Sequence, residues 1–234
     1  MEGVGIDGEP PRDTDRQVPW VVGVSGASGT PYAAAVLRGL LDAGESVDLV
    51  VSRASRLTLL DETGAAIRDA HWRADLARFL ARGADGTPDA FRVTGLDRVR
   101  HWSPGNLAAG PSSGSYPTRG MLIVPASTDC VAGVALGLSK DLLQRAASVT
   151  LKEGRPLVVT VRETPLNGPT LRHLVRLDDA GATVLPAAPA FYAGARHIQD
   201  LVNFVAGRAL DTVGVPHRLY RRWEGALGGG AHTE

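Results

Sequence analysis

The sequence has a single cysteine, Cys130, among its 234 residues. One cysteine excludes an internal disulfide and any zinc or iron–sulfur site built from several cysteines. The chain also lacks a run of about 20 apolar residues, the length that a membrane-spanning helix needs. Its first residues include acidic residues and prolines where a signal peptide has basic residues and then an apolar run. We therefore expect a cytoplasmic protein without disulfides.

Neither sign of charge is in excess, because 25 Lys and Arg residues balance 25 Asp and Glu residues. A general binder of nucleic acid or of anionic membranes carries a basic surplus, so the balance argues against both kinds of partner. Aromatic residues are scarce at 5%, whereas 28 glycines and 15 prolines indicate many tight loops. A hydrophobic fraction of 44% is enough to bury a core in a globular domain.

The two ends of the chain differ in composition from its body. Residues 1–19 are rich in acidic residues and proline, and residues 225–234 have too little apolar surface to fold. We therefore expect a disordered extension over residues 1–19, one domain over residues 20–224 and a disordered tail over residues 225–234.

Short apolar stretches alternate with helical ones, which predicts βαβ units and a parallel sheet. The predicted fold is a flavodoxin-like or Rossmann-like α/β domain, with a parallel sheet between layers of helices. A stretch rich in Gly, Ser and Pro, residues 102–119, predicts a long loop, and such loops are often functional. We expect strands at residues 20–24, 47–52, 121–125, 156–162 and 183–186, and helices at 31–42, within 53–82, near 128–137 and 140–153, and at 170–180 and 198–213.

The first predicted strand ends at the turn Ser25-Gly-Ala-Ser-Gly-Thr30, just before a helix. This arrangement favours an anion site, because free backbone N–H groups and the positive end of the helix dipole point at the ligand. The same small residues also fit a tight connection without any ligand. The glycine spacing does not match G-x-G-x-x-G, and Ser52 stands where an NAD site has an acid. Nor is there a nucleophile elbow or a Walker A loop.

A second polar turn, residues 127–130, follows the predicted central strand. Ligands of open α/β sheets bind outside the carboxyl ends of the strands, so two such turns indicate one ligand held from two sides. Helix capping is the alternative explanation for Ser127 and Thr128.

These turns and the segments that follow them resemble the UbiX-type flavin prenyltransferases. The resemblance spans about residues 21–223. It depends on SGASGTPY (25–32), VSRASRLTLLDET (51–63), SSGSYP (112–117), PAST (125–128), RAASVTLKEGRPLVVTVRETP (145–165), LPAAPAFY (185–192), Arg208 and Trp223.

The resemblance implies a homo-oligomer, commonly a dodecamer, of flavodoxin-like subunits that bind FMN near subunit contacts. Members of this family transfer a dimethylallyl group from dimethylallyl monophosphate to reduced FMN and build a fourth ring across N5 and C6. The prenylated FMN then serves a partner decarboxylase.

The same resemblance assigns roles to particular residues. It implies that FMN is bound by Gly26, Ala27, Ser28, Ser52, Ser127, Thr128, Asp129, Cys130 and Arg145. It implies a prenyl-phosphate clamp of Lys152, Arg162, Tyr192 and Arg208, active-site acids Glu62 and Glu163, and Trp223 near the prenyl group.

Expelling a phosphate from an allylic carbon requires a partner for the leaving anion. The one Asp-Asp pair, Asp178-Asp179, has no second acidic cluster to hold a metal, so we expect a metal-independent reaction in which cationic side chains meet the phosphate. Each hydrogen bond to a charged group contributes about 1.5–3 kcal/mol. Trp223 could stabilise allylic cation character, or it could simply pack the terminal segment. Glu62 could remove the proton from flavin C6, or it could be a carboxylate on a helix surface.

Two other functions remain open from the residues alone. One is an FMN-dependent peptidyl-cysteine decarboxylase, although such proteins usually carry Pro-Ala-Ser-Ala-Asn where this chain has Thr128-Asp129 after Ser127. The other is a non-catalytic FMN-binding or delivery protein. Cys130, where the family commonly has threonine, and the extra charge of Asp129 favour that alternative.

Overall fold

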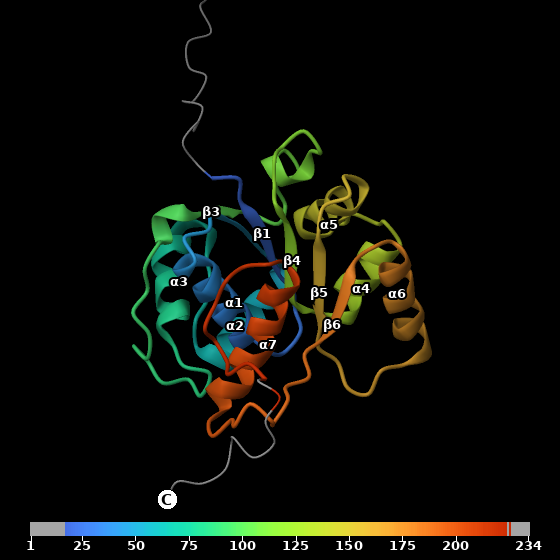
Figure 1. Ribbon diagram of the computed structural model, residues 1–234. Coiled ribbons are helices and arrows are strands. Elements are labelled where there is room, and N and C mark those ends of the chain that lie inside the picture. The colour runs from blue at the N-terminus through green and yellow to red at the C-terminus, as the bar shows by residue number, and fades with distance from the viewer. Residues whose placement is uncertain (1–16, 224, 226–234) are drawn as a thin grey trace, which may run out of the picture.

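The computed structural model describes residues 17–223 and residue 225. Most of the predicted N-terminal extension and nearly all of the predicted C-terminal tail lie outside these residues. The described part forms an α/β domain around a six-stranded sheet in the order β3-β2-β1-β4-β5-β6, with every neighbouring pair parallel (Figure 1). The strands are β1 (Trp20–Val24), β2 (Val47–Val51), β3 (Val99–Trp102), β4 (Gly120–Ala126), β5 (Leu157–Val161) and β6 (Thr183–Pro186).

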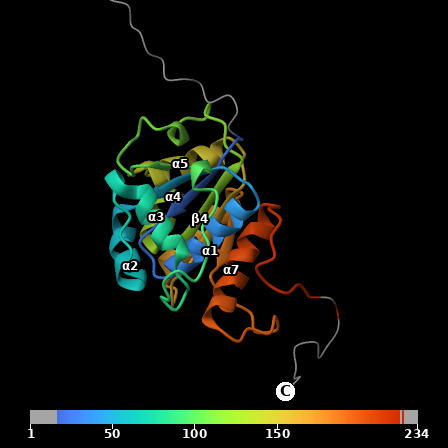
Figure 2. The same ribbon diagram turned by 90° about the vertical axis from the view of Figure 1, so that its left-hand side faces the viewer.

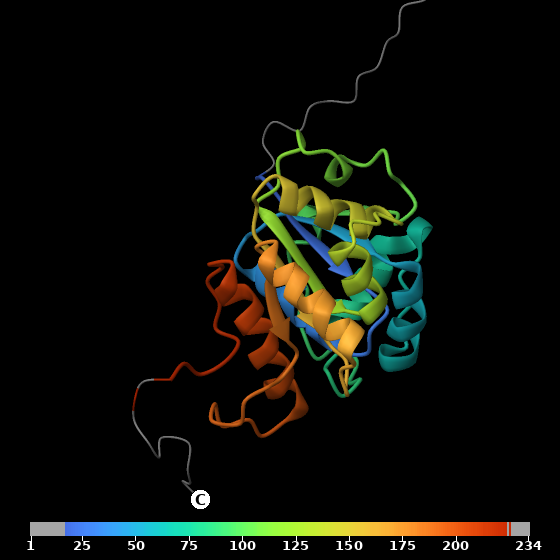
Figure 3. The same cartoon turned by 90° about the vertical axis from the view of Figure 1, so that its right-hand side faces the viewer.

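Helices cover both faces of this sheet. Figure 3 shows α4, α5 and α6 together over one face, and Figure 2 shows α1 between α3 and α7 on the other. The helices are α1 (Thr30–Asp42), α2 (Arg53–Thr63), α3 (Trp72–Ala81), α4 (Thr128–Ala135), α5 (Leu142–Lys152), α6 (Gly168–Asp179) and α7 (Ile198–Thr212). Short 3-10 turns lie at Asp69–His71, Leu96–Arg98 and Gly110–Ser112.

The alternation of side chains along β1 explains why the sheet has two cores. Val22 and Val24 pack with α1, α3 and α7, whereas Val21 packs with residues of α4, α5 and α6. All five residues of β1 are buried, as expected for a central parallel strand covered on both faces. The predicted doubly wound fold is therefore confirmed, and its strand order is that of a Rossmann-type sheet.

One strand differs from the sequence prediction. Strand β3 was not predicted, because its Arg100 and His101 interrupt the apolar pattern of an edge strand only four residues long. The helical stretch that we predicted over 53–82, with Gly64 as its interruption, is confirmed: Gly64 takes a positive φ of 62° and ends α2. The long loop over residues 102–119 is present, with one short 3-10 turn inside it.

The order of strands fixes where a ligand can bind. The chain moves outward from β1 to β2 and β3 and then returns to the other side of β1 as β4. The carboxyl ends of β1 and β4 therefore lie side by side with their following turns leading to different faces, which is the switch point where open α/β sheets bind ligands.

Candidate functional site

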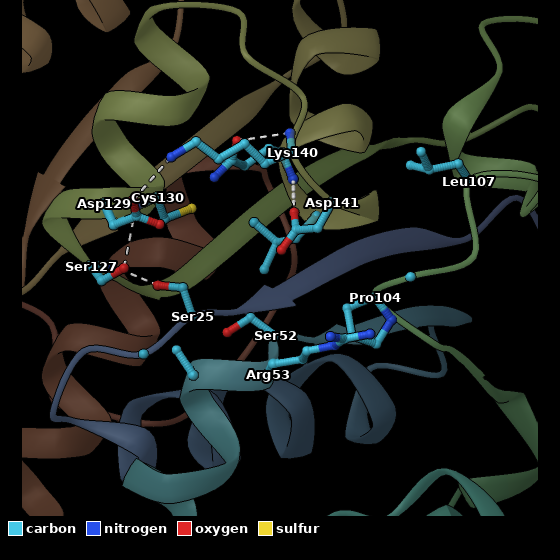
Figure 4. Close-up of a pocket in the computed structure, with 15 residues that line it drawn as sticks. Ser25, Ser52, Arg53, Pro104, Leu107, Ser127, Asp129, Cys130, Lys140 and Asp141 are labelled. Atoms are coloured by element: carbon cyan, nitrogen blue, oxygen red, sulfur yellow. Dashed lines mark hydrogen bonds and ion pairs between the residues drawn. The ribbon is translucent and has the colours of Figure 1, made fainter.

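A cavity of about 350 Å³ lies at this switch point, and Figure 4 shows the side chains around it. The first residues of α2, α4 and α5 and the turn that leads into α1 all border it. Three helix N-termini, those of α2, α4 and α5, thus converge on one cavity, so their free N–H groups and dipoles favour an anionic ligand. Its lining comprises Ser25, Gly26, Ser52, Arg53, Ala54, Pro104, Gly105, Leu107, Ser127, Asp129, Cys130, Lys140, Asp141, Leu143 and Gln144.

Polar side chains cap three of these helices. Ser52 Oγ accepts a hydrogen bond from Ser55 N at 3.1 Å, and Ser127 Oγ accepts one from Cys130 N at 3.3 Å. Asp141 Oδ1 accepts one from Gln144 N at 2.9 Å. The capping that we considered as the alternative for Ser127 is therefore present. It leaves the hydroxyl protons of the two serines able to donate to a ligand.

Ser25 joins the two turns that sequence reasoning expected to share a ligand. Its buried hydroxyl donates to Pro125 O at 2.8 Å and accepts from Ser127 N at 2.7 Å (Figure 4). Sequence reasoning did not single out this residue, although its place directly after β1 was a usable signal. The hydroxyl fixes the distance between the two turns and so sets the width of the cavity floor.

Two cations that the sequence prediction omitted border the cavity. Arg53 starts α2, and Lys140 precedes α5 and lies 3.5 Å from the carboxylate of Asp129. Figure 4 shows the Lys140 and Asp129 side chains directed toward each other across one wall. Both partners of this pair are largely exposed, so the pair contributes little to stability, and Lys140 remains available to a stronger anion.

Glu62 accepts hydrogen bonds from the N–H groups at the start of α1. Its carboxylate accepts hydrogen bonds from Gly29 N at 2.9 Å, from Thr30 N at 2.8 Å and from Thr30 Oγ1 at 2.7 Å. Burial raises the pKa of Glu62, but hydrogen bonds from Ser28, Thr30 and Gly29 outweigh it, and the pKa lies below its ordinary value. A ligand phosphate would have to displace this carboxylate to reach those two N–H groups.

Arg162 follows β5 and lies beside the same turn. A Cβ on Gly29 would fall 3.7 Å from Arg162 Cγ, and the Arg162 charge also acts on the Tyr32 hydroxyl, whose pKa burial raises. Arg162 Nε is buried and has no hydrogen-bond partner among the described residues. A buried donor without an acceptor is costly, and an anion placed here would satisfy it. Tyr32 is a further residue of this region that the sequence prediction did not select.

Tyr192, Arg208 and Trp223 form a separate group on α7 and the segments around it. The ring of Tyr192 meets Trp223 edge to face, with centroids 5.7 Å apart, and meets Phe204 in the same way at 5.8 Å. Arg208, whose pKa is raised chiefly by its hydrogen bond with Tyr220, also lies within electrostatic range of Tyr192. The structure therefore brings together three residues that are far apart in the sequence, but none of them lines the cavity at the switch point.

Two other predicted cations, Arg145 and Lys152, lie on α5. Arg145 Nε donates to Ser112 O at 3.0 Å, which ties the helix to the long loop. Lys152 pairs with Glu153 and lies against Gly114 of the same loop, since a Cβ there would fall 2.6 Å from Lys152 Nζ. The cavity lining extends along α5 to Gln144, so the backbone of Lys152, eight residues further, lies about 12 Å from it along the helix axis.

The remaining predicted residues are placed as follows. Gly26, Ser52, Ser127, Asp129 and Cys130 line the cavity, whereas Ala27, Ser28 and Thr128 lie in its two turns without lining it. Glu163 is exposed, and its Oε1 accepts from Thr164 N at 2.9 Å. Burial raises the pKa of the Cys130 thiol to about 12, with smaller contributions from Asp141 and Asp129.

The cavity fits FMN by its chemistry. Helix N-termini, two serine hydroxyls and two cations suit a phosphate, and apolar Pro104, Leu107 and Leu143 offer surfaces for a flat ring system. Gly26 keeps the floor open, because a Cβ there would lie 2.7 Å from the Cβ of Ala54.

In the described part of the chain, His, Cys, Asp and Glu side chains form no cluster of three or more that could hold a metal ion. The helices described here are all too short or too polar to cross a bilayer.

Comparisons with known proteins agree with this fold and with a protein that binds flavin. A family model described as Flavoprotein matches residues 9–210. The flavin prenyltransferase UbiX of Streptomyces coelicolor is 79% identical over 216 residues, covering 92% of this chain and 100% of that protein. Sheet, cavity and family model together define a flavoprotein of the α/β class. The chain belongs to the UbiX flavin prenyltransferase family.

Two solved structures extend the likeness to three dimensions. AnUbiX (PadA1) in complex with FMN and dimethylallyl pyrophosphate is 32% identical with a TM-score of 0.76, covering 91% of this chain and 100% of that chain. A dodecameric FMN-dependent UbiX-like decarboxylase from Escherichia coli O157:H7 is 32% identical with a TM-score of 0.75, covering 89% of this chain and 100% of that chain. The predicted family, fold and enzyme class are thus confirmed, and the prenyltransferase is favoured over both alternatives.

Proposed function

We propose that this protein joins a dimethylallyl group from dimethylallyl monophosphate to reduced FMN, without a metal ion. Reduced FMN supplies the nucleophilic N5 and C6 atoms. The C–O bond to phosphate breaks, bonds to N5 and C6 form, and of the two protons that these atoms lose, one returns to the dimethylallyl unit. The observation that carries the proposal is Arg162, a half-buried cation whose buried Nε has no partner among the described residues, beside the turn that borders a cavity suited to FMN.

The phosphate of FMN binds best at the wall formed by the first residues of α2, α4 and α5. Glu62 already occupies Gly29 N and Thr30 N, so the start of α1 offers less to an anion. Ser52 and Ser127 keep hydroxyl protons to donate, and Arg53 and Lys140 supply positive charge. With the phosphate there, Gly26, Ala27 and Ser28 in the first turn would hold the flavin ring.

The leaving phosphate of the donor requires cations next to that turn. Arg162 lies beside the first turn of its own chain, and Tyr192 and Arg208 lie together on the α7 side. Lys152 ends α5 far from the cavity of its own chain, so we assign it to the site of a neighbouring subunit. Arg145 on the same helix belongs to the same contact. A homo-oligomer, as in the dodecameric relative, would bring these groups to one site.

Glu62, Glu163 and Trp223 are proposed to act on the reacting groups. Glu62 is held ionised, and its hydrogen bonds with Ser28 and Thr30 form a path for a proton leaving flavin C6. Glu163 follows Arg162 and can orient it. Trp223, edge to face with Tyr192, offers an aromatic surface to positive charge on the dimethylallyl carbon. A cytoplasmic location and delivery of the product to a partner decarboxylase complete the proposal.

The deciding experiment mixes the purified protein with reduced FMN and dimethylallyl monophosphate in the presence of a chelator. Mass spectrometry of the extracted flavin should show one added five-carbon unit. A parallel reaction with dimethylallyl pyrophosphate tests the donor. Unmodified flavin in both reactions, from protein that binds FMN, would overturn the proposal in favour of a non-catalytic FMN-binding protein.

A further inference from the structure

One carboxylate on α7, that of Asp211, collects hydrogen bonds from four side chains. Arg222 Nη2 lies 2.7 Å from Oδ1, and the Tyr220 hydroxyl lies 2.5 Å from Oδ2. His217 Nε2 lies 3.0 Å from Oδ1, and Arg208 Nη1 lies 3.3 Å from Oδ2. Three of these donors belong to the segment after α7, which we call the C-terminal strap, residues 213–223.

The strap packs closely on α7 at this point. A Cβ on Gly207 would fall 2.5 Å from Tyr220 Cδ1 and 2.7 Å from His217 Cε1, so the absence of a side chain lets both rings reach the helix. The ring of Tyr220 also packs on Phe204, with centroids 4.9 Å apart. Phe204 in turn contacts Tyr192, which meets Trp223.

The state of His217 follows from its partners. Its Nδ1 accepts from Leu219 N at 3.2 Å, so the ring proton is on Nε2 and points at Asp211. The histidine is neutral in this arrangement, and the group formed by Asp211, Arg208 and Arg222 carries one net positive charge. Arg208 holds only long contacts, 3.3 Å to Asp211 and 3.5 Å to the Tyr220 hydroxyl, so its guanidinium can turn to a better acceptor.

We infer that Asp211 is a positioning residue for the prenyl donor: it fastens the strap that carries Trp223 and holds Arg208 in reach of the donor phosphate. Burial raises the pKa of Asp211, but hydrogen bonds from Arg222, Tyr220 and His217 outweigh it, and the pKa lies below its ordinary value. The carboxylate is therefore ionised at neutral pH. The inference rests on the proposed function, because it assigns Arg208 and Trp223 to the donor.

Charge and position predict opposite effects for Asp211→Asn. Removing the carboxylate adds one positive charge near Arg208, which by itself would tighten binding of an anionic donor. Detachment of the C-terminal strap from α7 would instead weaken binding of the donor. We expect KM for dimethylallyl monophosphate to rise about tenfold, as the loss of hydrogen bonds to a charged group implies. The KM for reduced FMN and the affinity for FMN should not change, because the flavin cavity shares no residue with this group.

The same assay separates the possible outcomes. Tyr220→Phe keeps the ring contacts and removes one donor, so it should raise the donor KM by a smaller factor, with little added effect in combination with Asp211→Asn. Asp89→Asn is the control, since it removes a carboxylate from an exposed loop position whose φ of 52° suits asparagine. A donor KM that is unchanged or lowered in Asp211→Asn, or an equal loss of FMN affinity, overturns the inference. If the wild-type protein itself fails to prenylate FMN, the proposed function fails instead.

Discussion

The carboxylate of Glu62, on α2, accepts hydrogen bonds from the backbone N–H and the hydroxyl of Thr30, the first residue of α1. This contact joins two helices that border the cavity and holds the turn between Gly26 and Gly29. A residue that sequence reasoning offered either as a proton acceptor or as a surface carboxylate is thus a helix cap in the structure. The two roles are compatible, because a carboxylate has lone pairs beyond those used here.

Replacing Glu62 with glutamine should lower stability in a pH-dependent way. Glutamine keeps one acceptor oxygen but replaces the other with an NH2 donor and removes the charge, which costs about 1–2 kcal/mol, or roughly 2–8 °C in Tm for a domain of this size. Folding lowers the pKa of Glu62 from 4.5, so its stabilising effect is fully present above that value and is lost as pH falls through the folded pKa. Thermal unfolding at pH 7 and at pH 4 measures this, with Asp61→Asn, an exposed neighbour on α2, as the control. An equal difference at both pH values would contradict the assignment.

A methyl group at Gly26 should weaken FMN binding. The added Cβ would lie 2.7 Å from the Cβ of Ala54, so the start of α2 would have to move away from the first turn. Such overpacking costs about 1–3 kcal/mol, which corresponds to about a fivefold to hundredfold loss of affinity if the strain falls on the cavity. Titration of FMN by its fluorescence measures the effect.

Gly168→Ala is the matched control for this substitution, because its Cβ would approach nothing closer than the flexible side chain of Arg172 at 3.4 Å. The control should bind FMN as the wild type does. An unchanged FMN affinity in Gly26→Ala would show that the flavin does not depend on the spacing between the first turn and α2.

The elements that sequence reasoning could place are those with a local signal. The turns at Ser52 and Ser127 follow apolar strands, and the carboxyl ends of parallel strands share one edge, so both were predicted at the site. Lys140 has no such signal, because it precedes a helix and reaches the cavity only through the packing of α5 beside α4. The role of Asp211 depends on residues 217–222 folding back on α7, which no periodicity reveals.

Lys152 and Arg208 should complement each other between subunits. Each alanine variant alone should bind FMN and fail to transfer the dimethylallyl group. If the two residues reach one site from different chains, dissociating and reassembling the mixed variants should restore about one quarter of the sites, since each site takes each residue independently. Activity of the reassembled mixture, relative to reassembled wild type, measures the recovery.

Complementation has a clear negative outcome. If one chain supplied both residues, every site of the mixture would lack one of them and no activity would return. The double variant Lys152→Ala/Arg208→Ala, reassembled in the same way, gives the background. Loss of FMN binding in Lys152→Ala would contradict its placement about 12 Å along α5 from the lining of its own cavity.

The thiol of Cys130 should be unreactive in the folded protein. Burial raises its pKa to about 12, and the nearby carboxylates of Asp141 and Asp129 act in the same direction. At pH 8 only about one thiol in ten thousand is then ionised, and the thiolate is the nucleophile. Alkylation with iodoacetamide, followed by mass spectrometry, should label the denatured protein fully in a time that leaves the native protein unlabelled. Because the chain has one cysteine, Cys130→Ser gives the blank, and native labelling as fast as denatured labelling would show that the thiol is open to solvent.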